Sequence, residues 1–173
     1  MSWTNHDKDE IFRFMGLAIA YADGCDFYLA EMFYILSETD NLSSYYCFGY
    51  NISADSRIEM LKIAHREYFR RKSKTSTMVL NVISKAKGLN SERNKIAHSS
   101  VWVQRRINST EESRLFPAAH QYRRWKGGEK PNYIYKRSDV EKLALRIKSL
   151  YEELYEVGLE LEKFDRRRHP RLA

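Results

Sequence analysis

The chain has 173 residues, of which 43% are hydrophobic, and this is enough for one globular domain that buries a core without disulfide or metal cross-links. Thirty Lys and Arg residues against 23 Asp and Glu residues give a net charge of +7, which favours an anionic partner such as nucleic acid. The polar N-terminus and the lack of a long apolar segment lead us to expect neither a secretory signal peptide nor a membrane span. Cys25 and Cys47 are the only cysteines, so we expect reduced thiols and a cytoplasmic location.

The segment from Ile11 to Leu36 predicts a long first helix. Its apolar residues recur at alternating steps of four and three, which places them on one helical face. Gly16 and Gly24 are the expected weak points, because glycine is less favourable than alanine in a helix interior. Phe12 and other apolar residues lie beside this face, so more than one neighbour has to cover the helix. A bundle core and a dimer partner both meet that need.

A second helix is expected after the polar and aromatic stretch at 39–51. Ser53 or Asp55 can supply its N-cap, because both side chains accept hydrogen bonds from first-turn N–H groups. His65 lies on its apolar face, and we interpret it as a hydrogen-bonded core residue with no catalytic role. A basic cluster marks the end of this helix, namely Arg66, Arg70, Arg71, Lys72 and Lys74. Such runs are also typical of solvated helix ends.

The apolar pattern from Met78 to Leu89 predicts a third helix. Gly88 predicts a break or kink near its end, because glycine often terminates a helix. Asn90 or Ser91 can then cap a helical continuation.

Alternation replaces the helical period after position 98. Residues 101–105 predict a first strand. Residues 115–125 and 132–137 predict a hairpin around a glycine-rich turn. Pro117 favours an edge position for its strand, because proline cannot donate to a β-ladder.

The last helical pattern begins at a capping box, Ser138-Asp139-Val140-Glu141, and continues to Phe164. Residues 166–173 are expected to form a basic C-terminal tail. Together the patterns predict an all-α fold, a bundle of four to five helices with a small β-hairpin insertion at about 101–137, before the last helix. We expect one helical domain over residues 1–165.

The segment Glu92-Arg93-Asn94-Lys95-Ile96-Ala97-His98-Ser99 has the clearest catalytic chemistry. Cleavage of RNA requires a base for the ribose 2′-OH, an acid for the leaving 5′-oxygen and positive charge near phosphorus. His98 exchanges a proton near neutral pH, which suits a general acid or base. Arg93 offers a permanently charged donor fork to phosphate oxygens. Asn94 lies four residues before His98, where its amide can orient the imidazole or contact the phosphate, and Lys95 adds charge.

The same eight residues resemble the signature of the HEPN superfamily, in which an Arg, four to six further residues and a His often mark a metal-independent ribonuclease. The resemblance implies a helical domain with the motif late in a central helix, and a homodimer in which two motifs share one cleft. It also implies a prokaryotic toxin or antiviral effector whose products end in a 2′,3′-cyclic phosphate, with an antitoxin or nucleotidyltransferase as partner. Ser100 stands where some members carry a modified Tyr, which puts that modification in doubt.

The spacing of Arg93 and His98 raises a geometric difficulty. Five residues on a regular helix separate them by roughly 140° of rotation, so they do not share a face. Either the helix unwinds near His98, or Arg93 reaches around it, or a two-fold dimer brings two copies of the motif together. We therefore expect a homodimer. The alternative is structural, with Arg93 paired to a carboxylate and His98 at a helix C-terminus.

Further basic and aromatic residues are expected to contact RNA, namely Lys95, Arg105, Arg106, Arg123, Arg124 and Trp125. For those in the β-region, packing within the hairpin is the alternative. The histidines and cysteines show no metal-ligand spacing, so we expect no metal and no other cofactor. Two alternatives to a ribonuclease stay open: a non-catalytic HEPN module that binds nucleic acid or nucleotide, and a helical adaptor protein.

Overall fold

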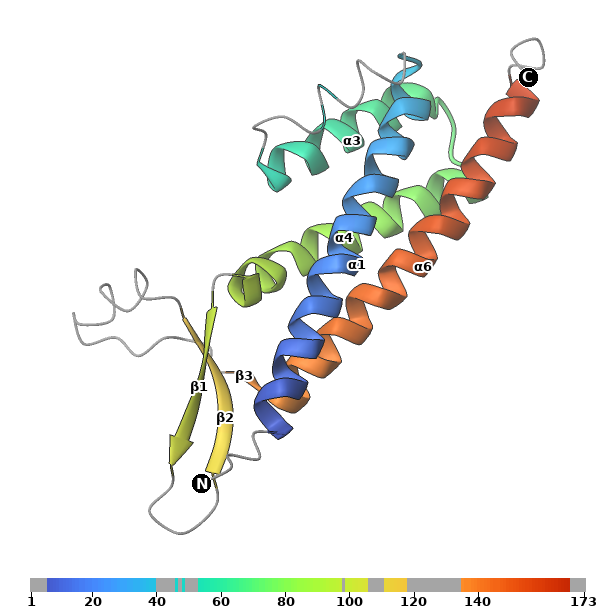
Figure 1. The fold of residues 1–173 in the computed structure, drawn as a ribbon. Helices are drawn as coiled ribbons and strands as arrows, with labels where there is room; N and C mark the ends of the chain where they lie inside the picture. Colours follow the sequence, from blue (N-terminus) through green and yellow to red (C-terminus); the bar gives the residue numbers. More distant parts are fainter. Residues whose placement is uncertain are drawn as a thin grey trace. The chain divides into compact units, whose positions relative to one another are not determined.

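The computed structural model describes residues 6–39, 46, 48, 53–97, 99–105, 111–117 and 135–168, with side chains in these ranges except at 6, 7, 90, 100–105 and 111–117. These residues form α1 (His6–Ser37), α3 (Ala54–Tyr68), α4 (Lys74–Ala97) and α6 (Arg137–Arg168), and the strands of a three-stranded sheet come between α4 and α6 in the sequence (Figure 1). The all-α fold with a β-insertion before the last helix is as predicted. None of the helices described combines the length and the apolar character that a membrane crossing needs.

The described chain divides into two compact units. The sheet unit contains the chain up to Tyr21 and residues 91–147, and the bundle unit contains residues 22–90 and 148 onward. The divisions fall within α1, α4 and α6, so each of these helices contributes a segment to both units.

In the bundle unit, α3 and the segments of α1, α4 and α6 pack around one apolar core. The core residues are buried side chains from all four helices, including Leu29, Met32, Leu36, Ile58, Leu61, Val79, Val82, Ile83, Leu150, Leu154 and Leu161. Burying one such side chain contributes about 1.5–3 kcal/mol, so this core is the main source of stability. Ion pairs also join neighbouring helices, namely Asp26–Arg57 at 3.2 Å, Glu59–Lys87 at 3.5 Å and Lys85–Glu153 at 2.7 Å.

Contacts between residues far apart in sequence fix the directions of the helices in this unit. Tyr28 of α1 lies beside Tyr151 of α6, with ring centroids 5.3 Å apart, and Glu38 follows α1 and pairs with Arg168 of α6 at 3.5 Å. From the first contact to the second, the residue number rises in α1 and also in α6, so the two helices run parallel. The α3 and α4 helices run antiparallel.

The first helix, α1, is continuous through both of its glycines. Gly24 has a packing role, because a Cβ placed there would lie 2.6 Å from the ring of Tyr151. Gly16 has nothing within 4 Å of such an atom. Cys25 is buried, and burial raises the pKa of its thiol to about 12, with the charge of Asp26 adding to the shift. Cys47 lies outside the described residues.

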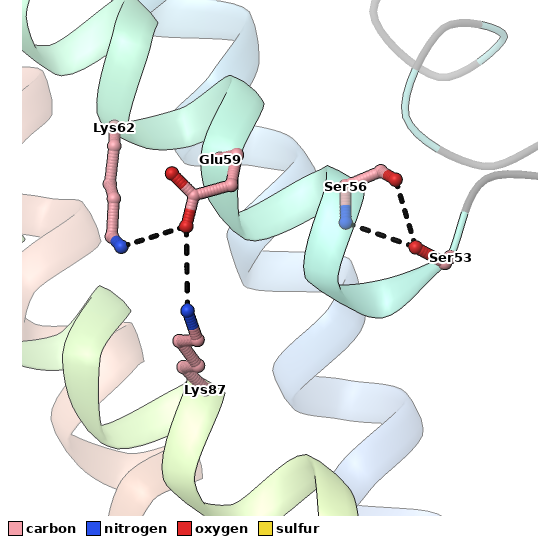
Figure 2. Close-up of polar contacts among 5 residues, drawn as sticks. All are labelled: Ser53, Ser56, Glu59, Lys62 and Lys87. Atoms are coloured by element: carbon pink, nitrogen blue, oxygen red, sulfur yellow. Dashed lines mark hydrogen bonds and ion pairs between the residues drawn. The ribbon is translucent and has the colours of Figure 1, made fainter.

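Ser53 caps α3, which confirms one of the two predicted N-caps. Its Oγ accepts a hydrogen bond from the backbone N–H of Ser56 at 3.1 Å, and the two hydroxyls lie 2.8 Å apart (Figure 2). Figure 2 also shows Glu59 between Lys62 of the same helix and Lys87 of α4. This carboxylate therefore joins α3 to α4.

His65 is a buried core residue, as predicted. Its Nε2 lies 3.0 Å from both the carbonyl oxygen and the Oγ of Ser76, in the first turns of α4. Burial lowers the pKa of His65, while the hydrogen bond to the Ser76 backbone opposes the shift. Neutral His65 therefore joins α3 to α4.

The α4 helix is longer than predicted and begins at Lys74. Ser73 caps it, because its Oγ accepts from the backbone N–H of Ser76 at 3.0 Å and its carbonyl from that of Thr77 at 3.1 Å. The helix continues through Gly88 to Ala97, so the predicted break with a new cap at Asn90 or Ser91 is wrong, whereas the alternative of a kink at Gly88 stays a prediction. Buried residues on both sides of this glycine hold the helix together.

The α6 helix begins at Arg137, earlier than the predicted capping box. Asp139 accepts a hydrogen bond from the backbone N–H of Lys136 at 2.9 Å, which is the role that the box assigned to Glu141. Residues 166–168 of the basic C-terminal segment form its last turn. Tyr68 of α3 reaches this end and donates to Asp165 Oδ1 at 2.6 Å.

The sheet unit has strands β1 (Ser99–Arg105), β2 (Glu111–Pro117) and β3 (Tyr135–Lys136) in the order β1-β2-β3, with antiparallel pairs. The strand that follows the motif, β1, is as predicted. The second strand of the predicted hairpin is also present, as β3 at 135–136, and it pairs antiparallel with β2. The edge position predicted for the strand of Pro117 is wrong, because β2 lies between the other two. Pro117 is tolerated at the last position of its strand, opposite Ser99.

Candidate functional site

The motif occupies the last two turns of α4, in the sheet unit. Residues 92–97 are helical, α4 ends at Ala97, and β1 begins at Ser99. Ser99 Oγ donates a hydrogen bond to the carbonyl oxygen of Lys95, which satisfies an acceptor in the last turn of the helix. His98 is the single position between the helix and the strand, and it lies outside the described residues.

Arg93 lies on the core-facing side of α4. It comes seven residues after buried Ala86 and three before fully buried Ile96, and both steps keep a residue on one helical face. Its side chain is half-buried and its Nε is enclosed by protein. The aliphatic part of the Arg93 side chain is therefore packed against α4 and its surroundings, and this packing determines where the guanidinium lies.

Asn94 is exposed and lies next to this guanidinium. Arg93 Nη1 donates to Asn94 Oδ1 over 3.5 Å, which is a long hydrogen bond. The sequence predicts that the Asn94 amide orients the His98 imidazole or contacts the phosphate, and this stays a prediction because His98 lies outside the described residues; the described contact of the amide is with Arg93. Lys95 is half-buried beside them, so three of the four predicted motif residues lie together at the end of α4.

An ion pair engages the acidic residue that begins the motif. Glu92 Oε2 lies 3.1 Å from Arg146 Nη1 of α6. The carboxylate nearest to Arg93 in sequence is thus neutralised by another residue. An anion that approaches the end of α4 meets less repulsion as a result.

The other predicted RNA contacts belong to the β-region. Arg105 is the last residue of β1, opposite Glu111 in the register. Its side chain, and the whole of Arg106, Arg123, Arg124 and Trp125, lie outside the described residues.

Sequence reasoning missed a basic pocket in the bundle unit. It is lined by Ser73, Lys74 and Thr75 at the start of α4 and by Glu160, Phe164, Arg167 and Arg168 near the end of α6. The two basic segments are visible in the sequence as separate clusters almost 100 residues apart. Only the antiparallel packing of α4 on α6 brings them together.

Comparisons with known proteins leave the family of this chain open. No protein-family model matches it, and no curated protein and no solved structure matches it.

Proposed function

We propose that the chain is a metal-independent endoribonuclease of the HEPN type, with Arg93 and His98 as its catalytic residues and Asn94 beside them. The observation that carries this proposal is the placement of Arg93. Its stem is held on the core-facing side of α4, its guanidinium contacts Asn94, and His98 follows where the helix has ended. The positive net charge of the chain supports RNA as the substrate.

The reaction follows from the chemistry of these groups. A base removes the ribose 2′-OH proton, and the 2′-oxygen attacks phosphorus. The bond from phosphorus to the 5′-oxygen then breaks, and an acid protonates that oxygen, so the products carry a 2′,3′-cyclic phosphate and a 5′-hydroxyl. His98 serves as the acid or the base, because its ordinary pKa lies near neutrality. Arg93 stabilises the additional negative charge on the phosphorane.

A homodimer provides both roles of the histidine at once. Two copies of the motif facing each other supply two imidazoles and two guanidiniums to one phosphate. The exposed apolar side chains of α1 support a second copy as partner, since Phe12 is 48% and Phe27 is 50% exposed. The biological role that the resemblance implies is a prokaryotic toxin or antiviral effector in the cytoplasm, controlled by an antitoxin or a nucleotidyltransferase.

Cleavage of labelled single-stranded RNA in EDTA tests this function. We expect Arg93→Ala and His98→Ala each to lower the rate by about 100-fold or more, as the loss of a charge-stabilising or acid–base group does. Arg66→Ala is the matched control, because this exposed arginine of the bundle unit pairs with the adjacent Glu67. Arg93→Met keeps the packed stem and removes only the charge, so its loss of activity without loss of folding would identify the guanidinium as the active group.

Mixing the two inactive variants tests the composite site. A mixed dimer of Arg93→Ala and His98→Ala holds one intact Arg93 and one intact His98 on different subunits, so it regains part of the wild-type rate if this pair acts across the interface, and it stays inactive if both imidazoles are required. Equal cleavage by the wild type and both variants would overturn the ribonuclease proposal.

A non-catalytic module that binds RNA is the second candidate, and the basic pocket of the bundle unit favours it. Absence of cleavage together with salt-dependent RNA binding would select this module. Absence of both would leave a helical adaptor.

A further inference from the structure

The basic pocket of the bundle unit has the volume of a small-molecule site. Its volume is about 640 Å³, within the range of small-molecule pockets. Ser73, Lys74 and Thr75 form one side, and Phe164 and Arg167 of α6 line the other. All of these belong to the bundle unit, whereas the motif residues belong to the sheet unit.

Two cations in this pocket are available to a ligand. Arg168 is already engaged, because its Nη1 donates to the Tyr68 carbonyl at 3.1 Å and its guanidinium lies 4.4 Å from the Tyr68 ring centroid. In the described part of the chain, no carboxylate lies within ion-pair distance of Lys74 or Arg167. Arg167 Nε donates to the carbonyl of Lys163 at 3.1 Å, which positions its guanidinium at the end of α6.

Among the described residues, Glu160 is the one carboxylate that lines the pocket, and its charge is compensated. Its Oε1 lies 2.8 Å from Lys163 Nζ, and this contact lowers the pKa of Glu160. Arg167 and Lys74 lower that pKa further, so both cations act on the same small region. The pocket therefore keeps a positive potential despite its carboxylate.

The backbone of α4 adds partial positive charge to the same side. Ser73 caps the helix by accepting from Ser76 and Thr77, which leaves the backbone N–H groups of Lys74 and Thr75 without an acceptor inside the helix. These groups and the helix dipole favour an anion at the start of α4.

The positive charge continues beyond the pocket along the connection from α3 to α4. Arg70, Arg71 and Lys72 are exposed, and among the described residues none has a carboxylate at ion-pair distance. Three further cations exceed what one small phosphate ester needs, so this extension favours a polyanion. Phe164 also lines the pocket and adds an aromatic side chain to it, with its ring centroid 5.2 Å from that of Phe69.

We propose that this pocket binds a backbone phosphate of single-stranded RNA, between Lys74, Arg167 and the start of α4, and that Arg70, Arg71 and Lys72 bind neighbouring phosphates. The choice of RNA among polyanions rests on the proposed function. The pocket belongs to a different unit of the chain from the motif, and it has no part in the chemical step.

A charge-matched pair of double variants tests the pocket. Lys74→Gln/Arg167→Gln removes the two available cations. Lys62→Gln/Arg66→Gln removes the same charge from α3, where each residue pairs locally, Lys62 with Glu59 at 2.9 Å and Arg66 with Glu67 at 3.2 Å. Both pairs are placed in a His98→Ala chain so that RNA stays intact, and equal melting temperatures verify folding.

Fluorescence anisotropy with a labelled single-stranded RNA, between about 50 and 200 mM salt, is the measurement. We expect the pocket variant to bind about tenfold more weakly, and the slope of log K against log salt to fall by about 0.7, the value for the one single-strand phosphate that the variant no longer neutralises. The control keeps its affinity and slope. If both variants bind RNA equally weakly, or if neither loses affinity, the proposal that the pocket binds RNA is wrong.

Two further measurements distinguish RNA binding at the pocket from lipid binding there and from cleavage at the motif. If the pocket variant loses binding to anionic phospholipid vesicles but keeps its RNA affinity, the assignment to RNA is wrong. If a chain with intact Arg93 and His98 never cleaves RNA but the pocket variant binds it more weakly than the control, the ribonuclease proposal fails and the pocket stands. If that chain cleaves RNA and the pocket variant binds it unchanged, the pocket alone fails.

Discussion

Replacement of Gly24 by alanine is expected to destabilise the bundle unit, although alanine is the better helix former. A Cβ at Gly24 would lie 2.6 and 2.7 Å from two ring carbons of Tyr151. That ring also packs on Tyr28, with centroids 5.3 Å apart, so moving it disturbs a second contact. Overpacking of this kind costs about 1–3 kcal/mol, against a gain of about 1 kcal/mol in helix propensity. We therefore expect a net loss of about 0–2 kcal/mol.

Two other glycines provide matched controls in the same experiment. Gly16 lies in the same helix, and Gly158 lies in α6 within the same unit as Tyr151. Neither has an atom within 4 Å of an added Cβ, so alanine at each should stabilise by about 0.5–1 kcal/mol. Urea unfolding followed by circular dichroism measures all three, and Gly24→Ala should differ from its controls by about 1–3 kcal/mol.

A double-mutant cycle identifies the cause. In a Tyr151→Leu chain the ring is absent, and Gly24→Ala should lose most of its penalty. If Gly24→Ala stabilises the wild-type chain as much as Gly16→Ala does, then α1 and α6 do not approach closely at this point. The helix pairing described for the bundle unit would then be wrong.

Three further predictions concern α3, two of them its contacts with neighbouring helices and one its own N-cap. Burial holds the pKa of His65 below its ordinary value, so its neutral form contributes stability above about pH 6.5 that is lost as the pH falls towards the folded-state pKa, by up to about 1.4 kcal/mol per pH unit. The urea midpoint should therefore fall more between pH 7.5 and 5.5 in the wild type than in His65→Gln, and equal falls would exclude this residue as the cause. Tyr68→Phe removes the 2.6 Å hydrogen bond to Asp165 and should cost about 1–2 kcal/mol in chemical unfolding, whereas an unchanged midpoint would show that the bond adds nothing. Ser53→Ala removes the N-cap bond to Ser56 and should cost about 1 kcal/mol by the same assay, with Ser53→Asp as the variant that retains it.

The sequence predicts the helices well where one apolar face is unbroken. The stripe of α1 and the pattern of α6 give both helices, because burial of an apolar face decides helix existence more than single residues do. The same effect explains the wrong break at Gly88. Alanine would gain only about 1 kcal/mol there, whereas Ala86 and Ile96 on either side bury apolar surface in one continuous helix. A helix-breaking residue such as glycine therefore does not end a helix where tertiary packing favours its continuation.

The sequence alone does not show which distant segments come together in the fold. The clusters at 70–74 and 166–168 each resemble a solvated helix end, and nothing in either segment indicates the other. Likewise Pro117 favours an edge strand by its own chemistry, but β2 became central because a two-residue β3 pairs with it at Arg114 and Leu115, short of the proline. Both features depend on which elements pair, and that depends on the whole fold.

For the motif, the sequence predicts the helical face of each residue but not what lies next to it in the fold. The periodicity of α4 predicts that residue 93 follows residues 86 and 89 on one face, and the structure has Arg93 there, half-buried. A guanidinium at a core-facing position is costly to desolvate, and an apolar residue of similar length would pack at that position without the charge. Asn94 beside the guanidinium, the pairing of Glu92 with Arg146 and the end of the helix one residue before His98 are features that recognition of a phosphate uses. The ribonuclease proposal rests on this combination of groups at the end of α4.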